Sequence, residues 1–119
     1  MASTLLVVSI DCTAPGRLAD FWSQALGYKA RRELPSGTQL IAEDEQATPW
    51  LAFISVPEAK RTKNRLHLDL SPDDQEAEVE RLLALGATHS DVGQSADAAW
   101  VVLTDPEGNE FCVLPPRRP

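Results

Sequence analysis

The side chains best suited to chemistry lie in two stretches of the second half of the chain, RLHLDL and NEFCVL. An unperturbed histidine titrates near neutral pH, so His67 could act as a general base, with Asp69 or Glu110 modulating it. Cys112 could also pair with His67 as a thiolate and an imidazole. No local nucleophile motif surrounds Cys112, so a small polarizable filler is the simpler interpretation. For His67 the simpler alternative is a histidine that only forms hydrogen bonds on a polar sheet face.

The same residues raise the question of a metal site, since a catalytic zinc usually has three protein ligands. His67 and Cys112 would supply two donors, and a third would have to come from Asp69, Asp11 or Glu110. An iron-dependent dioxygenase would need two histidines and a carboxylate. The other histidine, His89, follows the second expected helix and is not placed with them. The sequence therefore predicts no metal or other cofactor; if a metal is present, His67 with Cys112 or Glu110 would hold it.

The elements that would position these residues begin with a β-rich run, LLVVSI, at residues 5–10. The stretch RLADFWSQALG follows, with apolar residues at helical spacing, Pro15 ready for a first helical position and Gly27 as a stop. Three short candidate strands come next, in YKARREL, TQLIAED and WLAFISV. A basic, polar connector, PEAKRTKN, ends this half of the chain, and an ordinary linker is its simplest interpretation.

The second half repeats this order. A strictly alternating strand at 65–70 leads to a helix start in which Ser71 is the expected cap, and candidate strands follow in ATHSDV, AWVVLT and EFCVLP. Both helices end in Ala-Leu-Gly, at residues 25–27 and 84–86, which are 59 residues apart. The sequence predicts an α+β fold of two β-α-β-β-β modules in tandem, with curved, antiparallel-rich sheets around a concave cleft. It is one domain over 1–119: module one at about 4–57, a connector at about 57–64 and module two at about 65–115.

Strand alternation assigns side chains to the two faces of each sheet. The residues expected to face the helices and the core are Leu6, Val8, Ile10, Leu66, Leu68, Leu70, Phe111 and Val113. The residues expected to line a ligand cleft are Ser9, Asp11, Arg65, His67, Asp69, Glu110 and Cys112, joined by Trp100 as an apolar wall for a flat ligand. A half-exposed antiparallel sheet without any function would show the same alternation. By the same argument Cys12 and Cys112 lie on opposite faces, which excludes a disulfide between them.

Composition limits the partners. Eighteen acidic residues against eleven basic ones give a formal charge of −7, which disfavours nucleic acid and anionic membranes because both require a basic surface. The opening MASTLLVVSI has no basic segment, and its apolar run is far too short for a signal peptide or a membrane span. Two cysteines are too few for a disulfide scaffold, so a reduced, cytoplasmic setting is expected.

Three stretches, LADFWSQALGY, KNRLHLDL and DPEGNEFCVL, together with the duplicated element order, resemble the vicinal oxygen chelate superfamily, which contains glyoxalases, bleomycin-resistance proteins and extradiol dioxygenases. Within it the chain is most similar to the glyoxalase-like domain group. The resemblance implies a homodimer and a site on the concave face of the paired sheets. It also implies four metal-ligand positions, which fall here at Val7, near Leu51 or Phe53, at His67 and at Cys112. Only the last two carry a donor, and relatives have Glu where Cys112 stands.

The resulting functional prediction is a small-molecule-binding protein of the glyoxalase-like group that lacks the usual metal site, with metal-free acid–base chemistry at His67. Enzymatic activity, as a lyase or isomerase, is left open. The first alternative is a metal-dependent lyase, isomerase or dioxygenase with a remodelled site. The second is drug sequestration of the bleomycin-resistance kind, in which an acidic surface attracts a cationic aromatic antibiotic. A fold alone does not decide between these functions.

Overall fold

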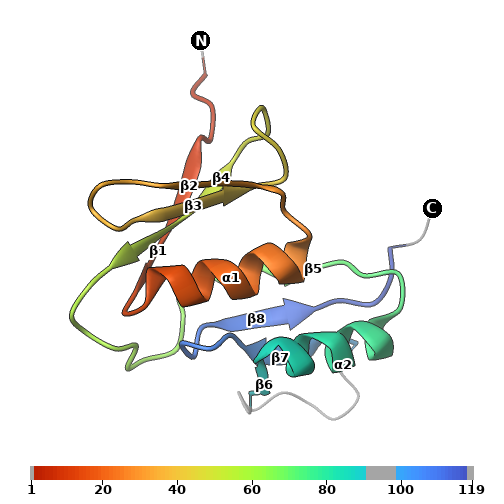
Figure 1. The fold of residues 1–119 in the computed structure, drawn as a ribbon. Helices are drawn as coiled ribbons and strands as arrows, with labels where there is room; N and C mark the ends of the chain where they lie inside the picture. Colours follow the sequence, from red (N-terminus) through yellow and green to blue (C-terminus); the bar gives the residue numbers. More distant parts are fainter. Residues whose placement is uncertain (1, 91–98, 118–119) are drawn as a thin grey trace. The chain divides into compact units, whose positions relative to one another are not determined.

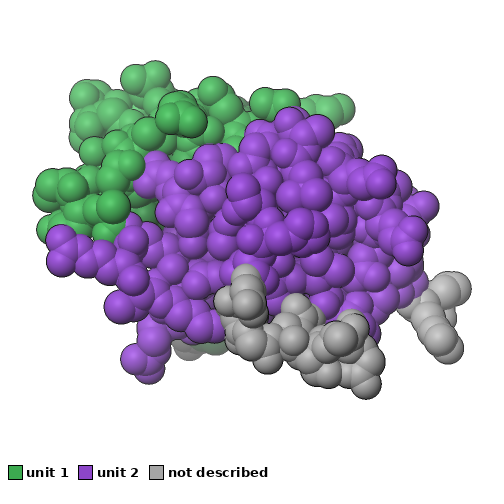
Figure 2. Space-filling view, turned by 90° about the horizontal axis from the view of Figure 1, so that it is seen from below, with its two compact units in different colours: residues 1–59 green, residues 60–119 purple. Residues whose placement is uncertain are grey.

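A computed structural model describes residues 2–90 and 99–117 of the chain. The chain divides into two compact units, residues 1–59 and 60–119, which are coloured separately in Figure 2. In the described residues, each unit has the order strand, helix and three further strands (Figure 1). This result confirms the α+β fold and the repeated element order predicted from the sequence.

The first unit contains a mixed sheet with the strand order β1-β4-β3-β2. Its elements are β1 (Val7–Cys12), α1 (Pro15–Leu26), β2 (Ala30–Glu33), β3 (Gln39–Ala42) and β4 (Trp50–Ser55). β1 runs parallel to β4, while the β3–β4 and β2–β3 pairs are antiparallel. Parallel strands need a long crossover between them, and α1 with the β2–β3 hairpin provides it.

Helix α1 follows its sequence signals closely. Pro15 occupies the first helical position, and Gly27 ends the helix with a left-handed φ of 66° that favours glycine. Of the apolar residues predicted at helical spacing, Leu26 is half-buried and the others are fully buried: Leu18, Phe21, Trp22 and Ala25. Ala19 is buried as well. The Phe21 and Trp22 rings meet edge to face with their centroids 5.2 Å apart. The amphipathic helix predicted here is confirmed.

Trp50 belongs to the core of the first unit. It is 9% exposed and packs in a cluster with Ala30, Ala42 and Val7. The guanidinium of Arg32 lies 5.1 Å from the centroid of the Trp50 ring, a separation at which a cation is attracted to the ring face. The indole is therefore already covered on one side by a side chain of its own sheet.

The second unit contains a mixed sheet with the strand order β5-β8-β7-β6. Its elements are β5 (Asp69–Leu70), α2 (Gln75–Leu85), β6 (Thr88–His89), β7 (Val101–Thr104) and β8 (Glu110–Val113). β5 is parallel to β8, and the β7–β8 and β6–β7 pairs are antiparallel. The fully buried residues of this unit include Leu82 of α2, Leu103, Phe111 and Val113, so the inward orientation predicted for Phe111 and Val113 is confirmed. Asp91 and Val92, the end of the strand predicted at 87–92, lie outside the described residues.

The cap of α2 differs from the prediction. Asp74, not Ser71, is the N-cap, and its carboxylate accepts a hydrogen bond of 3.1 Å from the amide of Ala77. Ser71-Pro72-Asp73-Asp74 offers three side chains able to cap, and the one that caps is the one adjoining the first helical residue, Gln75.

The first strand of the second unit is shorter than predicted, because β5 contains only Asp69 and Leu70. In a parallel ladder the next hydrogen bond toward its start would run from the Leu68 amide to the Glu110 carbonyl. That carbonyl instead accepts from Asn64 Nδ2 at 3.1 Å. Leu66 therefore lies outside the ladder and is 83% exposed, which makes its predicted orientation toward the helix wrong.

The first strand of the chain shows a similar difference. β1 begins at Val7 rather than at Leu5, and Leu5 and Leu6 are 64% and 62% exposed. The partner strand β4 begins at Trp50, whose amide donates to the Leu6 carbonyl at 2.9 Å. Residues before Leu6 thus lie beyond the end of the partner strand, and the burial predicted for Leu6 is wrong.

Among the described residues, no helix is long and apolar enough to cross a membrane.

Candidate functional site

The candidate site is a group of three side chains in the second unit: His67, Asp69 and Cys112. One donor atom from each lies within 4.8 Å of the others. The parallel register pairs Asp69 of β5 directly with Cys112 of β8, and His67 precedes Asp69 by two residues. Of the cleft residues predicted from the sequence, these are the three that the structure brings together.

Cys112 is held as a neutral thiol. The residue is 8% exposed, and burial is the largest cause that raises the pKa of its thiol. The Asp69 carboxylate raises this pKa further through its charge and a hydrogen bond, while the charge of Lys63 lowers it by less. The net upward shift leaves little thiolate at neutral pH, which argues against Cys112 as an unassisted nucleophile.

His67 and Asp69 form a pair at the surface of the second unit. His67 Nδ1 lies 3.0 Å from Asp69 Oδ1, and the two side chains are 43% and 46% exposed. This separation is within ion-pair distance, so the Asp69 carboxylate lies against the Nδ1 edge of the His67 ring. Within the described part of the chain, Nε2 has no hydrogen-bond partner. Nε2 is therefore available for contact with a ligand.

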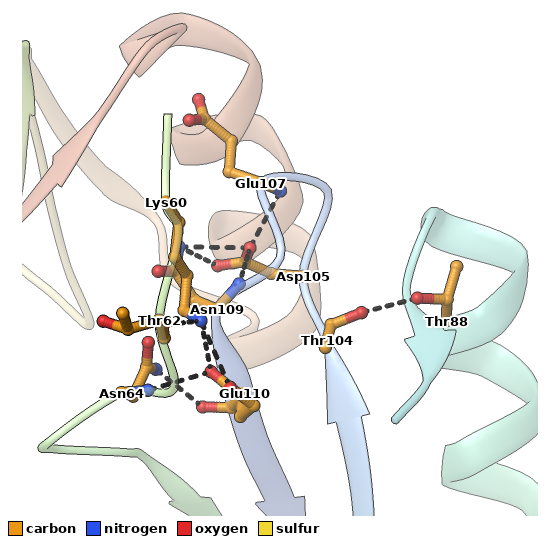
Figure 3. A network of polar contacts seen from close by, with 9 residues as sticks. All are labelled: Lys60, Thr62, Asn64, Thr88, Thr104, Asp105, Glu107, Asn109 and Glu110. Carbon is orange, nitrogen blue, oxygen red and sulfur yellow. Dashed lines mark hydrogen bonds and ion pairs between the residues drawn. The ribbon is translucent and has the colours of Figure 1, made fainter. Parts of the chain in front are cut away.

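Glu110 faces a different set of partners from those of His67. Its carboxylate pairs with Lys60 Nζ at 3.0 Å and accepts from the Asn64 amide at 3.3 Å, as Figure 3 shows. Lys60 also donates to the Thr62 carbonyl within the connector. Burial alone would raise the pKa of Glu110, but hydrogen bonds from Lys60, from the Glu110 backbone and from Asn64 lower it, as does the charge of Lys60. The net shift is downward, so Glu110 is ionised at neutral pH.

The remaining residues predicted to line the cleft are Ser9, Asp11, Arg65 and Trp100. Ser9 and Asp11 are exposed on β1 of the first unit, paired in register with Ala52 and Ile54. Arg65 is exposed in the segment before β5. Trp100 immediately precedes β7 and is 45% exposed. Their roles in ligand binding remain predictions.

The first unit carries different side chains at the equivalent positions. β4 and β8 begin 60 residues apart, at Trp50 and Glu110. In both units the amide of the residue after the last strand donates to the carbonyl 44 residues earlier, from Val56 to Cys12 and from Leu114 to Leu70. This common register places Val7, Ser9 and Ala52 where the second unit has His67, Asp69 and Cys112.

The register also corrects one position implied by the resemblance. The first-unit position was expected near Leu51 or Phe53, but the register pairs Ser9 with Ala52 as it pairs Asp69 with Cys112. Leu51 and Phe53 alternate with Ala52, the residue equivalent to Cys112, and so point to the other face of β4. Ala52 and Val7 offer no metal ligand.

Sequence reasoning missed the part of Lys60 and Asn64. Both lie in the connector that was interpreted as an ordinary linker. They bind Glu110, which is 50 residues from Lys60 and 46 residues from Asn64 along the chain. The one available signal was the positive charge of this segment. Nothing local identifies its partner, since a contact of this kind depends on the tertiary fold.

A divalent ion fits the donor set in chemical type. Imidazole nitrogen, carboxylate oxygen and thiolate sulfur are all zinc ligands, and ligand atoms in a tetrahedral zinc site are about 3–4 Å apart. The three donors lie within 4.8 Å of one another, which is close to that spacing. Binding would require Cys112 to lose its proton, which couples metal affinity to pH.

Known structures share the fold at low sequence identity. A glyoxalase/bleomycin resistance protein/dioxygenase family enzyme from Burkholderia phytofirmans has a TM-score of 0.70 and 19% identity, covering 95% of this chain and 98% of its own. The antibiotic-binding protein TnmS3 from Streptomyces has a TM-score of 0.65 and 20% identity, covering 98% of both chains. The fosfomycin resistance protein FosX from Listeria monocytogenes, solved with Mn(II) and a dihydroxypropylphosphonic acid, has a TM-score of 0.70 and 10% identity, covering 96% and 90%.

No curated protein sequence matches the chain. The family model described as the glyoxalase-like domain matches residues 7–114. This match includes both units, all ten helices and strands of the described residues, and the His67, Asp69 and Cys112 group. The chain therefore belongs to the glyoxalase-like domain family, within the vicinal oxygen chelate superfamily.

Proposed function

We propose that this protein binds a small molecule at the His67, Asp69 and Cys112 group and that His67 is its acid–base residue. The observation that carries the proposal is the 3.0 Å contact between His67 Nδ1 and Asp69 Oδ1. A carboxylate on Nδ1 fixes the tautomer and orientation of the ring and stabilises the imidazolium that forms when Nε2 takes a proton. Both side chains are about half exposed, so a ligand can reach them.

The chemistry open to this group without a metal is proton transfer. His67 Nε2 would accept a proton from a bound ligand or return one to it, and Asp69 would stabilise the charged ring. A positioned general base contributes about 10²–10⁴-fold to a rate. The neutral Cys112 thiol would provide a small, weakly polar contact. A lyase or isomerase that moves a proton fits these capacities, as does a binder that uses the same hydrogen bond.

A thermal-shift screen followed by calorimetry tests this function, using a library that contains small carbonyl compounds and cationic aromatic antibiotics. His67→Gln should lower the affinity for the selected ligand by about tenfold or more, because the hydrogen bond between the imidazole of His67 and the ligand is lost. Asp69→Asn should have a smaller effect in the same direction. His89→Gln is the matched control, because His89 is exposed on β6 and is absent from the group. Equal losses in His67→Gln and His89→Gln, or no ligand at all, would contradict the proposal.

The second candidate function is metal-dependent chemistry, and the observation that favours it is the closeness of the three donors. His67, Asp69 and Cys112 would hold the ion, leaving one coordination position for a ligand. A bound divalent ion would act as a Lewis acid on a ligand oxygen. His67 would then bind the ion and could not act as a base. One molecule of the protein therefore cannot perform both functions at once.

Zinc titration of chelator-treated protein separates the two functions. If the metal site exists, zinc at one hundred times its Kd should add about 2.7 kcal/mol to the free energy of unfolding. Cys112→Ala should remove this gain, whereas Cys12→Ala should retain it because Cys12 donates to the Ile54 carbonyl in the first unit. An identical zinc response in the two cysteine variants would show that the zinc is bound elsewhere.

Sequestration of a cationic antibiotic remains a prediction from the net charge of −7. The fold likeness to TnmS3, described as an antibiotic-binding protein, is compatible with it. The homodimer also remains a prediction. The antibiotics in the screen test the sequestration, and light scattering tests the homodimer.

A further inference from the structure

The connector between the repeated halves is bound to the strand that carries Cys112. Lys60 Nζ lies 3.0 Å from one Glu110 carboxylate oxygen and 3.2 Å from the other. Asn64 donates twice, from its amide to the Glu110 carboxylate at 3.3 Å and from Nδ2 to the Glu110 carbonyl at 3.1 Å. We call these contacts of Lys60 and Asn64 with Glu110 the connector anchor; Figure 3 shows them from close by.

The anchor is partly shielded from water, with Lys60 exposed as a residue and Glu110 and Asn64 half-buried. The Glu110 side chain is 11% exposed and that of Lys60 is 22% exposed. A shielded ion pair costs desolvation and is a weak source of stability by itself. Removing one partner would leave the charge of the other without its ion-pair partner. An anchor of this kind fixes the path of the chain more than it adds to stability.

The chain path fixed in this way is the one that carries His67. Asn64 is held by Glu110, and Leu68 is held by Cys112, whose amide donates to the Leu68 carbonyl at 2.9 Å. Only three residues, 65–67, lie between these two points, and they belong to no helix or strand. So short a span has few conformations once both ends are fixed. The position of His67 therefore depends on where Asn64 is held.

Glu110 and Cys112 also lie on one strand, two residues apart, and so project to the same face. The strand that presents the Cys112 thiol thus also presents the carboxylate that holds the connector. Any shift of the connector along β8 would change the distance from His67 to Cys112. The anchor replaces a ladder hydrogen bond with side-chain contacts, and this replacement releases 65–67 from the sheet.

We infer that Glu110 is a positioning residue, which holds Lys60 and Asn64 so that the segment 65–67 carries His67 to Asp69 and Cys112. The effect of Glu110 on ligand binding rests on the proposed function. Its effect on the position of His67 does not. Glu110 acts through the connector and needs no contact with the ligand. This role also differs from that of a ligand-lining residue, which was the prediction from the sequence.

The test uses four variants of the full chain: Glu110→Ala, Glu110→Gln, Asn64→Ala and, as the matched control, Glu80→Gln. Glu110→Gln keeps an oxygen acceptor for Asn64 but loses the charge that pairs with Lys60. Asn64→Ala removes only the Nδ2 hydrogen bond and retains the backbone donor. Glu80 is an exposed glutamate of α2 in the same unit. If Glu110→Ala does not fold, the other two site variants still decide the outcome.

Two readouts need no ligand. The first is the imidazole tautomer of His67, followed by long-range proton–nitrogen NMR with His89 as internal reference. The second is the rate at which iodoacetamide alkylates Cys112, resolved by mass spectrometry from the rate at Cys12. We expect Glu110→Ala to change the tautomer ratio of His67 from its wild-type value and to raise the alkylation rate of Cys112 about tenfold through local opening. For both readouts, Glu110→Gln and Asn64→Ala should give values between those of Glu110→Ala and the wild type. Glu80→Gln should give the wild-type values.

Other outcomes overturn the inference. If Glu110→Gln and Asn64→Ala lower the melting temperature but leave both readouts at the Glu80→Gln level, Glu110 has a structural role only. If alkylation of Cys12 rises as much as that of Cys112, the variants loosen the whole chain. Ligand affinity is measured separately, below the melting temperature. Variants that change both readouts while the wild type binds no compound would leave the positioning role standing and count against the proposed function alone.

Discussion

Phe111→Ala is expected to lower the free energy of unfolding by about 3–5 kcal/mol, the usual cost of removing a buried phenylalanine ring. Phe111 is 1% exposed and lies in the core of the second unit with Leu82, Leu103 and Val113. Removing the ring deletes its transfer free energy and leaves a cavity that the neighbours fill only in part. Chemical denaturation followed by tryptophan fluorescence and circular dichroism measures the change.

Leu66→Ala is the matched control for this loss. Both residues were predicted to point into the same core, yet Leu66 is 83% exposed. Replacing an exposed apolar side chain usually changes the free energy of unfolding by less than about 0.5 kcal/mol. A cost for Leu66→Ala that approaches that of Phe111→Ala would mean that Leu66 is packed and that β5 extends further than Asp69.

Asp105→Ala is expected to cost about 2–4 kcal/mol, because it removes a buried acceptor that several donors share. Asp105 is 3% exposed. Its Oδ1 accepts from the amides of Glu107 and Asn109 at 2.9 and 3.0 Å, and its two oxygens also accept from Asn109 Nδ2. The turn reverses the chain between β7 and β8, with Gly108 at a φ of 86°. Distortion of this turn in Asp105→Ala should also change the NMR chemical shifts of the β8 amides.

Asp44→Ala provides the comparison for Asp105. Asp44 is exposed, and its Oδ1 accepts from the Gln46 amide at 2.9 Å, so it forms a similar local turn without the burial. Its replacement should cost less than about 1 kcal/mol, the usual net value of one hydrogen bond. Asp105→Asn, which keeps one oxygen acceptor, should fall between the two alanine variants. Equal costs at Asp44 and Asp105 would show that burial of the turn carboxylate adds nothing.

The features that local sequence could predict were those with local causes. Pro15, the helical spacing of Leu18, Phe21 and Trp22, and Gly27 act within a few residues of one another, and the structure contains the helix that they indicate. The duplicated element order could be predicted because each element carries its own pattern. The cap of α2 was assigned wrongly since several cap-forming side chains occur in succession, and small differences in geometry decide among them.

The length of a strand depends on its partner and was less predictable. RLHLDL has a strict alternation, but only Asp69 and Leu70 pair with β8. The competing contact, from Asn64 to the Glu110 carbonyl, joins residues 46 positions apart. Hydrophobic alternation is a local signal, and in this segment a tertiary contact overrides it.

The candidate site could be predicted in part. His67 and Cys112 followed from the resemblance, and Asp69 followed from alternation along its strand. The structure brings the three together. The contacts of Glu110 could not be predicted because they depend on how the connector folds back on β8. The sequence names the ionisable residues on a face, whereas the fold decides which of them meet.

The two units have one backbone register but different side chains at the three equivalent positions, and this difference limits stoichiometry. His67, Asp69 and Cys112 have Val7, Ser9 and Ala52 as their counterparts, and within the described residues the ligand-type group occurs once. A titration with zinc or with a ligand that needs this group should reach saturation at one equivalent per chain. A dimer would then bind two equivalents, so the ratio of bound ligand to chain would stay at one whatever the assembly.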